Sequence, residues 1–429
     1  MSAITKIDLW QVLDSRGMPT VAARVSCGDK SANAIAPSGA STGAHEALFL
    51  RDNKSSYNGN SVNDSIARFT AEVLPHLIGI DGNDFAELDK TLRNYDSSRT
   101  FSKYGGHIPV AITIAAWLAT AKVNNFEPFS VIADHLVTTP TLPLPMVNIF
   151  SGGAHAGGAI DLQDILAVPV GATSIEEAME WVWKVRESTK SLLSKSGHDQ
   201  SLVADEGGVT ARLQSDEQAL EFVSDGIVKA GLSGKVAIAL DIAATQSFQG
   251  DHYQIHESGN IKTLSSEQFV SRWNKWLDLY PIISVEDGAA EDDNEGWQQQ
   301  RENCDRIQII GDDRYATQNH RLISGIANSE ANSILIKPNQ AGTLHSALTA
   351  LATAKDANWG TVVSARSGDT EENWLVDLAV GSNAGQIKVG STHRSERSAK
   401  WNRLLELSHF GTAPCIGKAA LSHVKKLNI

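Results

Sequence analysis

The sequence has few cysteines, no long apolar run and no dense cluster of basic residues. Its three cysteines, Cys27, Cys304 and Cys415, are far apart and odd in number, which argues against a disulfide framework and favours a reducing compartment. The longest apolar stretch, residues 108–121, is shorter than the roughly 20 residues that a membrane span needs. The opening MSAITKIDLW lacks the apolar core of a secretory signal peptide. These absences together predict a soluble, cytoplasmic protein.

The charge balance is acidic, with 37 Lys and Arg residues against 50 Asp and Glu residues and a formal net charge of −13. This balance argues against nucleic acid or an anionic membrane as a partner. A small anionic substrate is not excluded, because a bound divalent metal can invert the local field. The length of 429 residues predicts two or three domains, or one small domain and a barrel.

The first third of the chain has the pattern of an α+β domain. Residues 20–25 alternate like a half-buried strand, and a loop rich in Gly and Ser follows at 37–43. Helical periodicity then covers residues 63–78 and 110–123.

The best candidate for a domain boundary is the segment TPTLPLP at residues 139–145, because prolines interrupt regular pairing and stiffen a connection. We therefore expect a smaller N-terminal α+β domain over residues 1–138 and a catalytic domain over residues 139–429.

One pattern recurs after this boundary: a short apolar run ends in a charged residue and is followed by a helical stretch. It is found at residues 236–241, 282–286, 307–312, 334–337, 361–366 and 385–388. Near-continuous apolar strands separated by helices are typical of a parallel sheet, and this many repeats favour a closed (β/α) barrel with its strand ends at one mouth. A doubly wound open sheet is the main alternative, but it would not bring six strand ends around one centre.

Three of the strand ends are carboxylates: Asp241, Glu286 and Asp312. Anions gathered at one barrel mouth repel one another unless a cation neutralises them. Oxygen ligands without His or Cys indicate a hard ion, Mg²⁺ or Mn²⁺, rather than zinc. The alternative for each residue alone is a solvated helix N-cap.

Two further strand ends are lysines, Lys337 and Lys388. A lysine beside a metal ion and a second ammonium group loses its proton more easily, as a general base requires. A salt bridge to the acidic residues is the alternative interpretation. A metal-bound carboxylate substrate with an acidic α-hydrogen would suit such a site.

Three local segments add weaker signals. A Gly-rich loop at residues 151–158 carries His155, and Glu206 precedes a Gly-Gly pair. Arg366 and Ser367 follow a strand and combine a guanidinium fork with a hydroxyl, as an anion-binding site does.

Taken together, these segments resemble the enolase family. The resemblance rests on DSRG at 14–17, PSGASTG at 37–43, SGGAHAGG at 151–158, DEGGV at 205–209, RSG at 366–368, GQIK at 385–388 and RSER at 394–397. It implies an α/β protein with a C-terminal TIM-like (β/α)8 barrel of the enolase type and a smaller N-terminal α+β domain.

The resemblance also implies a two-metal site. Asp241, Glu286 and Asp312 match the ligands of the first Mg²⁺ ion, and Ser41 in the PSGASTG loop matches a residue that binds the second Mg²⁺ ion and the substrate. Mn²⁺ is the expected substitute.

The implied reaction is the dehydration of 2-phosphoglycerate to phosphoenolpyruvate. Lys337 matches the base that removes the proton from C2, and Lys388 matches the cation that pairs with the substrate carboxylate. Glu206 matches the acid that assists departure of the β-hydroxyl, and Asp164 occupies another acidic position of the catalytic site.

The remaining substrate contacts follow from the same resemblance. His155, Arg366 and Ser367 match positions that contact the closed loop and the substrate phosphate. The expected partner is thus a small phospho-carboxylate, and the family also allows a homodimer. At the family's dimer interface, however, Ala22 and Glu406 replace an ion pair.

Several residues depart from the family pattern near the leaving group. Ala365 replaces a histidine, Asp164 replaces a longer glutamate, and Arg314 replaces an aliphatic residue. Gln246 occupies a position that is acidic in the family. One alternative is therefore a recruited paralogue of phosphonate biosynthesis that forms carboxyphosphonoenolpyruvate, with Arg314 binding the added charge. Another alternative is a non-catalytic enolase-like protein.

Overall fold

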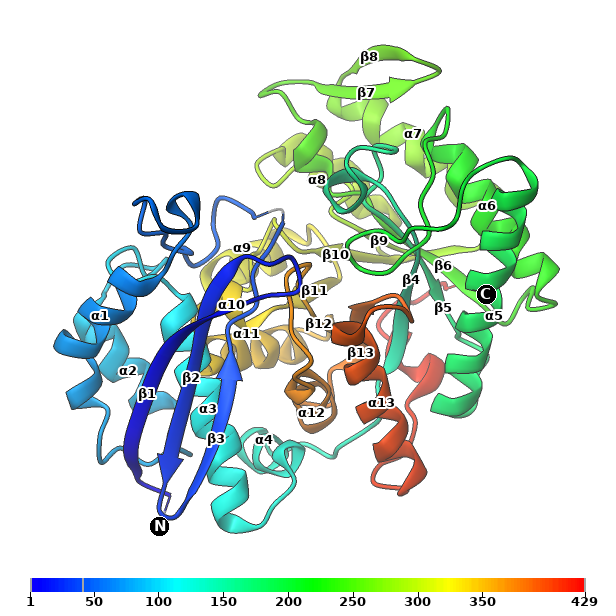
Figure 1. Ribbon diagram of the computed structural model, residues 1–429. Coiled ribbons are helices and arrows are strands. Elements are labelled where there is room, and N and C mark those ends of the chain that lie inside the picture. Colours follow the sequence, from blue (N-terminus) through cyan, green and yellow to red (C-terminus); the bar gives the residue numbers. More distant parts are fainter. Residues whose placement is uncertain (1, 41, 428–429) are drawn as a thin grey trace.

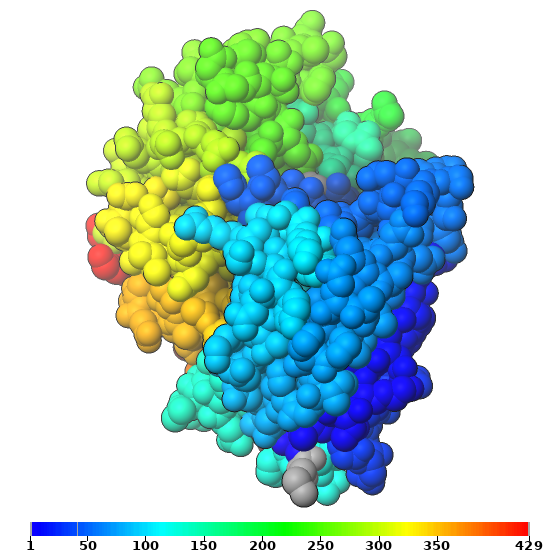
Figure 2. Space-filling model, turned by 90° about the vertical axis from the view of Figure 1, so that its left-hand side faces the viewer, coloured from blue at the N-terminus to red at the C-terminus, as the bar shows by residue number. Residues whose placement is uncertain are grey.

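A computed structural model describes residues 2–40 and 42–427 of the chain. Figure 1 shows an N-terminal sheet with its helices lying beside a barrel that is surrounded by helices. In Figure 2 the N-terminal part, in blue and cyan, packs along the yellow and green regions of the barrel. No helix among the described residues is long and apolar enough to cross a membrane.

The N-terminal part consists of a three-stranded antiparallel sheet covered by helices. Its elements are β1 (Ile4–Leu13), β2 (Pro19–Cys27), β3 (Lys30–Ile35), α1 (Asn63–Glu72), α2 (Phe85–Tyr95), α3 (His107–Asn124) and α4 (Pro128–Leu136). The strand expected at 20–25 and the helix expected at 110–123 are confirmed, and the long apolar run is the buried helix α3 against the sheet. The helix expected at 63–78 ends at Glu72, because Pro75 starts a short 3-10 turn, Leu74–His76.

The barrel is closed by eight strands. In spatial order they are β10 (Gln308–Gly311), β11 (Ser333–Ile336), β12 (Gly360–Ser364), β13 (Gly385–Gly390), β4 (Leu144–Ser151), β5 (Asp164–Val168), β6 (Ala237–Asp241) and β9 (Ile282–Glu286). All six strands expected from the apolar runs are present, and the α/β barrel is confirmed. The Pro-rich segment 139–145 runs directly into β4.

The expectation of a wholly parallel sheet is wrong at one strand. β5 pairs antiparallel with both β4 and β6, whereas the other neighbours are parallel. The connection from β4 to β5 contains only the 3-10 turn Gly153–Ala156 and no α-helix. Without a helical crossover the chain can only return antiparallel.

Helices cover the outside of the barrel, and a hairpin projects beside α7 (Figure 1). The helices are α5 (Ile175–Lys195), α6 (Asp216–Lys229), α7 (Ser266–Leu279), α8 (Asn294–Gln300), α9 (Asn319–Asn328), α10 (Pro338–Ala341), α11 (Leu344–Asp356), α12 (Trp374–Gly381) and α13 (Ser395–His409). The hairpin is β7 (Tyr253–Glu257) with β8 (Asn260–Leu264). Five of these helices begin at a side-chain N-cap: Ser174, Ser215, Ser265, Asp293 and Thr343.

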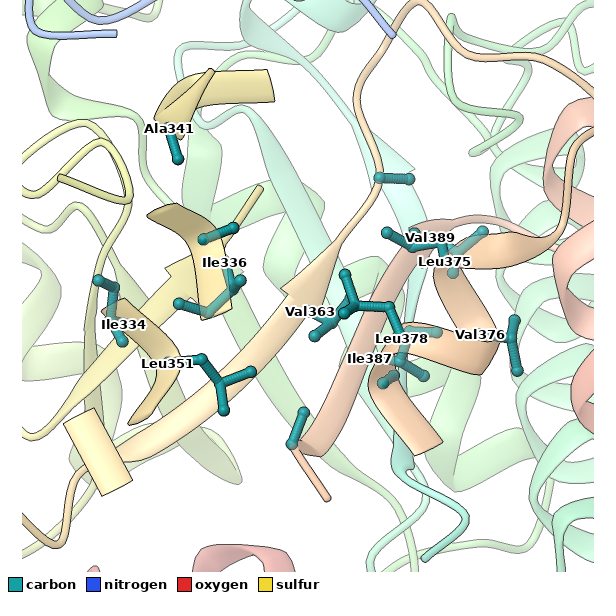
Figure 3. Packing of buried hydrophobic residues seen from close by; sticks show 14 of the residues in the cluster. Ile334, Ile336, Ala341, Leu351, Val363, Leu375, Val376, Leu378, Ile387 and Val389 are labelled. Atoms are coloured by element: carbon teal, nitrogen blue, oxygen red, sulfur yellow. The ribbon is translucent and has the colours of Figure 1, made fainter. Parts of the chain in front are cut away.

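Alternation along the strands divides the core into two layers. Ile334 and Ile336 face the surrounding helices, where they pack in one cluster with Leu351 and Leu375 (Figure 3). Leu335 between them belongs to a second apolar cluster that fills the barrel interior. Because the side-chain period of a strand is two, the residues at each strand's end continue this alternation into the barrel mouth.

One buried histidine makes the fold sensitive to acid. His107 starts α3, is fully buried and stacks on the ring of Phe49 at 4.3 Å between centroids. Burial, with the nearby Arg51 charge, lowers the pKa of His107 to about 3. Between this value and the usual pKa near 6.5, the unfolded chain binds a proton that the folded protein does not. Stability therefore falls as the pH drops from about 7 towards 3.

We predict that His107→Phe reduces this acid sensitivity, because the ring stack is kept and no proton can be taken up. Between pH 7 and pH 5, wild type should lose about 2 kcal/mol more unfolding free energy than the variant, as measured by urea denaturation. His76→Phe, at an exposed histidine that packs on Tyr95, should behave like wild type. Equal losses in wild type and His107→Phe would contradict the assignment.

Candidate active site

Five residues predicted from the sequence come together at the barrel mouth. Asp241 and Glu286 end β6 and β9, and these two residues are direct neighbours in the parallel pair. Asp312 and Lys337 follow β10 and β11, and Lys388 lies within β13. All five are buried. The carboxyl ends of the parallel strands thus form one polar site above an apolar barrel interior.

Two ammonium groups offset part of the charge of the three carboxylates. The Nζ atom of Lys388 lies 2.7 Å from both Asp241 Oδ2 and Glu286 Oε2. The Nζ atom of Lys337 lies 2.5 Å from Asp312 Oδ2. The salt bridges that were the alternative interpretation of both lysines are therefore present, and they lie inside the site.

The pKa shifts show that negative charge is in excess. Burial and the Asp241 carboxylate raise the pKa of Glu286 well above its usual value, although Lys388 opposes the shift. Burial opposes the charge of Lys337 most strongly, but the carboxylates of Asp312 and Glu286 together leave the pKa of Lys337 raised. A carboxylate faces Lys337 directly in the free protein, and the expectation that Lys337 loses its proton easily beside a metal ion stays a prediction.

The donors at the mouth suit a hard divalent cation. Asp241, Glu286 and Asp312 offer only oxygen atoms, which is the ligand chemistry of Mg²⁺, and a cation would relieve the charge that raises the pKa of Glu286. Among the described residues, however, the groups whose ligand atoms lie within 4.8 Å of one another are two others: His155 with Asp164 and Glu206, and Asp287 with Asp312 and Asp313.

A second cluster of buried charged residues includes His155 of the Gly-rich loop, together with Asp164 and Glu206. The Nδ1 atom of His155 lies 2.8 Å from Asp164 Oδ2, and its Nε2 atom lies 3.9 Å from Glu206 Oε1. Ser151 donates a hydrogen bond of 2.9 Å to the other oxygen of Asp164, which Asn148 also contacts. Asp164 is thereby held in one orientation by three side chains.

The charges of this cluster depend on one another. Burial opposes a charge on His155, but the carboxylates of Asp164 and Glu206 raise the pKa of His155 to about 9. Burial would raise the pKa of Glu206, but His155 and Arg397 together hold it below its usual value. His155 is therefore a buried imidazolium at neutral pH, between two acids.

The predicted anion-binding pair lies beneath the loop at residues 37–46. The guanidinium of Arg366 makes a bidentate ion pair with Glu46, at 2.7 and 3.1 Å. Ser367 Oγ accepts a hydrogen bond of 2.6 Å from the backbone N–H of Ala40. Ala40 and Glu46 thus attach this loop to the barrel at two points. Ser41, between these two residues, lies outside the described residues.

The structure contains supporting residues that sequence reasoning missed. Asp287, at a positive φ of 43°, accepts hydrogen bonds from the backbone N–H groups of Asp312 and Asp313 at 2.9 and 2.8 Å. Gln340 donates hydrogen bonds to Asp312 Oδ1 at 2.9 Å and to Glu46 Oε1 at 3.3 Å. Asp287 directly follows the predicted strand end at Glu286, but no local signal pairs Glu46 with residues about 300 positions away.

Arg314 does not have the role considered for it. Its guanidinium donates to both carboxylate oxygens of Glu330 at 3.0 and 2.9 Å. It also reaches the carbonyl of Glu291 and the side chain of Asn294, both at 2.9 Å. Arg314 is therefore a buried structural cation behind the site, and the interpretation that it binds an added substrate charge is wrong.

We predict that Asp164→Asn lowers the pKa of His155 by roughly 1–3 units, because one of the two facing carboxylates loses its charge. An NMR titration of the imidazole nitrogens measures the shift. Asp161→Asn is the matched control, since Asp161 contacts a different histidine, His256, at 2.9 Å. A pKa of His155 that stays at about 9 in Asp164→Asn would contradict this charge arrangement.

Comparisons with known proteins agree with this geometry over nearly the whole chain. Residues 4–132 match the family model "Enolase, N-terminal domain", and residues 139–417 match "Enolase, C-terminal TIM barrel domain". An enolase of Campylobacter jejuni subsp. doylei is 38% identical over 409 residues, which are 95% of this chain and 97% of that protein. An enolase of Campylobacter jejuni subsp. jejuni serotype O:23/36 is 39% identical over the same shares. The chain therefore belongs to the enolase family.

Proposed function

We propose that this protein is a lyase of the enolase type that converts 2-phosphoglycerate to phosphoenolpyruvate. The observation that carries the proposal is the pairing of two lysines with three buried carboxylates at one barrel mouth. The 38–39% identity to enolases over 95% of the chain supports the same reaction.

Lys337 is the proposed base for the C2 proton. In the free protein its ammonium is held by Asp312 at 2.5 Å, so it must first lose a proton to act as a base. Asp312 raises the pKa of Lys337 and would oppose this proton loss less once its own charge is engaged by a cation. Lys388 is proposed to hold the substrate carboxylate, because it is a buried ammonium between two acids at the same mouth.

Magnesium is the proposed cofactor, with Mn²⁺ as a substitute. Asp241, Glu286 and Asp312 would hold the first ion, and Ser41 would contribute to a second. A divalent ion at these oxygens would supply Lewis-acid stabilisation of the negative charge that develops on the substrate carboxylate.

The leaving hydroxyl needs a proton, and the His155 cluster is the proposed source. His155, Asp164 and Glu206 are buried and lie within ion-pair distance, so they titrate as a unit. Glu206 is the proposed donor at the hydroxyl, and because its own pKa is held low, it would first take up the proton that the His155 imidazolium carries. Asp164 acts by holding His155.

The substrate phosphate is proposed to bind at Arg366 and Ser367. Both are buried under the loop that contains Ala40, so phosphate binding and the position of the loop are linked. His155 is proposed to contact this loop when it closes.

The phosphonate alternative is not favoured. It was motivated partly by Arg314, whose donors are taken by Glu330, Asn294 and the Glu291 carbonyl. A non-catalytic role is not favoured either, because the predicted acids and bases are brought together in buried ion pairs.

The proposal also covers the domain division, partner, location and oligomeric state of the protein. We propose a division into residues 1–138 and 139–429, a small phospho-carboxylate as the only class of partner, and a cytoplasmic location, in line with three free cysteines. A homodimer remains part of the proposal, although Ala22 is buried in β2 and Glu406 pairs with Arg403 of its own chain at 2.9 Å. Light scattering would decide the oligomeric state.

We predict that the purified protein with Mg²⁺ and 2-phosphoglycerate produces the ultraviolet absorbance of the enol phosphate. Lys337→Ala should lower the rate by about 10²–10⁴, because the base is lost. Lys355→Ala is the control, since Lys355 binds backbone carbonyls of Ser382 and Asn383. Absence of turnover by wild type across metals and pH would overturn the proposed function, and full activity of Lys337→Ala would overturn its mechanism.

A further inference from the structure

A chain of side-chain amides connects the Gly-rich loop to a proposed metal ligand. The backbone N–H of Ala154 donates to Gln246 Oε1 at 3.1 Å, and Gln246 Nε2 donates to Gln163 Oε1 at 2.6 Å. Gln163 Nε2 then donates to Asp241 Oδ2 at 3.1 Å. The four residues come from four separate segments, and the chain of hydrogen bonds is continuous from one end to the other.

The direction of these hydrogen bonds is determined at both ends. The N–H of Ala154 can only donate, so Gln246 must turn its carbonyl oxygen towards the loop and its NH₂ group towards Gln163. At the other end the Asp241 carboxylate can only accept, so Gln163 must turn its NH₂ group towards it. The two requirements agree only because both intervening residues are amides.

The last bond in the chain selects one oxygen of Asp241. Among the donors that the structure describes, Gln163 and Lys388 both reach Oδ2, at 3.1 and 2.7 Å. Oδ1 would thereby be the oxygen left for a cation. Partners that orient a metal ligand in this way typically change metal affinity by roughly 10–100-fold when they are removed.

The loop end of the chain is closely packed. Gly153 has a φ of +43°, and a Cβ atom there would lie 3.2 Å from both Gln163 Cα and Gln246 Oε1. Only glycine therefore lets the loop backbone approach the two amides this closely. The same short turn, Gly153–Ala156, carries His155 of the proposed proton-donating cluster.

We propose that Gln246 is a positioning residue that couples the Gly153–Ala156 turn to the orientation of Asp241 and so to Mg²⁺ binding. This inference rests on the proposed function, because it takes Asp241 as a Mg²⁺ ligand. Among the described residues, Gln246 is hydrogen-bonded to Ala154 and Gln163, and not to Asp241, Glu286, Asp312 or the two lysines.

A carboxylate at position 246 would break the chain of hydrogen bonds. Its oxygens could accept from Ala154 but could not donate to Gln163. Gln163 would then turn its own NH₂ group towards position 246 and present its carbonyl oxygen to Asp241 Oδ2, which would repel it. Asp241 would lose a donor and its fixed orientation.

Gln246→Glu tests the coupling, because the substitution has two effects on Mg²⁺ affinity and these have opposite signs. A new negative charge near the mouth tightens Mg²⁺ binding through its field, whereas loss of the amide chain weakens it. We predict that calorimetry with Mg²⁺ alone shows roughly 10-fold weaker binding in Gln246→Glu. Gln254→Glu adds the same charge on the exposed face of β7 and should bind Mg²⁺ as tightly as wild type or more tightly.

A double-mutant cycle separates the chain of hydrogen bonds from other effects. In the Gln163→Ala background, Gln246→Glu should cause no further weakening, because the link to Asp241 is already absent. Hydrogen exchange should also show faster exchange of the Ala154 amide in Gln246→Ala than in wild type.

The possible outcomes are distinguishable. Wild type that does not bind Mg²⁺ overturns the proposed function itself. Wild type that binds Mg²⁺, with Gln246→Glu binding it as tightly as Gln254→Glu does, overturns the coupling and leaves the proposed function intact. Additive effects of the two substitutions in the cycle would also overturn the coupling.

Discussion

Burial of like charges is the constraint on which the rest of this structure depends. Asp241, Glu286 and Asp312 end neighbouring strands of one barrel and are all removed from water. Such carboxylates destabilise the folded chain unless cations compensate them. In the free protein Lys337 and Lys388 provide part of that compensation, because two ammonium groups face three carboxylates. The same deficit of positive charge makes the mouth a suitable site for a divalent cation.

The N-terminal part of the chain completes this site through one loop. Glu46 reaches the barrel to pair with Arg366 and to accept from Gln340, which in turn donates to Asp312. A second contact, from the Glu372 carboxylate to the backbone N–H of Ile35 at 2.8 Å, fixes the sheet against α12. The loop is therefore anchored on the same side chains that surround the proposed ligands.

Much of the fold could be predicted from the sequence, because the apolar runs are long enough to distinguish strands from loops. Six barrel strands and the charged residues at their ends follow from local pattern alone. The sequence pattern does not indicate β4 or β5 as strands. Pro145 interrupts the apolar run of β4, and no helical stretch between β4 and β5 marks where β5 begins. The antiparallel pairing of β5 depends on a connection whose conformation no local pattern reveals.

Individual residues of the site were less accessible than the fold. The convergence of Lys388 with Asp241 and Glu286 follows once the barrel is assumed, since all three lie at or near the carboxyl end of a barrel strand. The environment of Arg314 does not follow, because its partner Glu330 lies on a different segment and both are buried together. The raised pKa of Lys337 could not be anticipated either, since it depends on burial, on Asp312 and on other charged groups at the mouth.

The central claim is that Asp241, Glu286 and Asp312 bind one divalent cation at the barrel mouth. Crystals grown with Mn²⁺ and measured for its anomalous scattering test this directly. The account predicts an anomalous peak within about 2.5 Å of an oxygen from each of the three carboxylates, with Lys388 displaced from between two of them. A peak confined to the His155–Asp164–Glu206 group or to Asp287 and Asp313, with Lys388 still bridging Asp241 and Glu286, would contradict it.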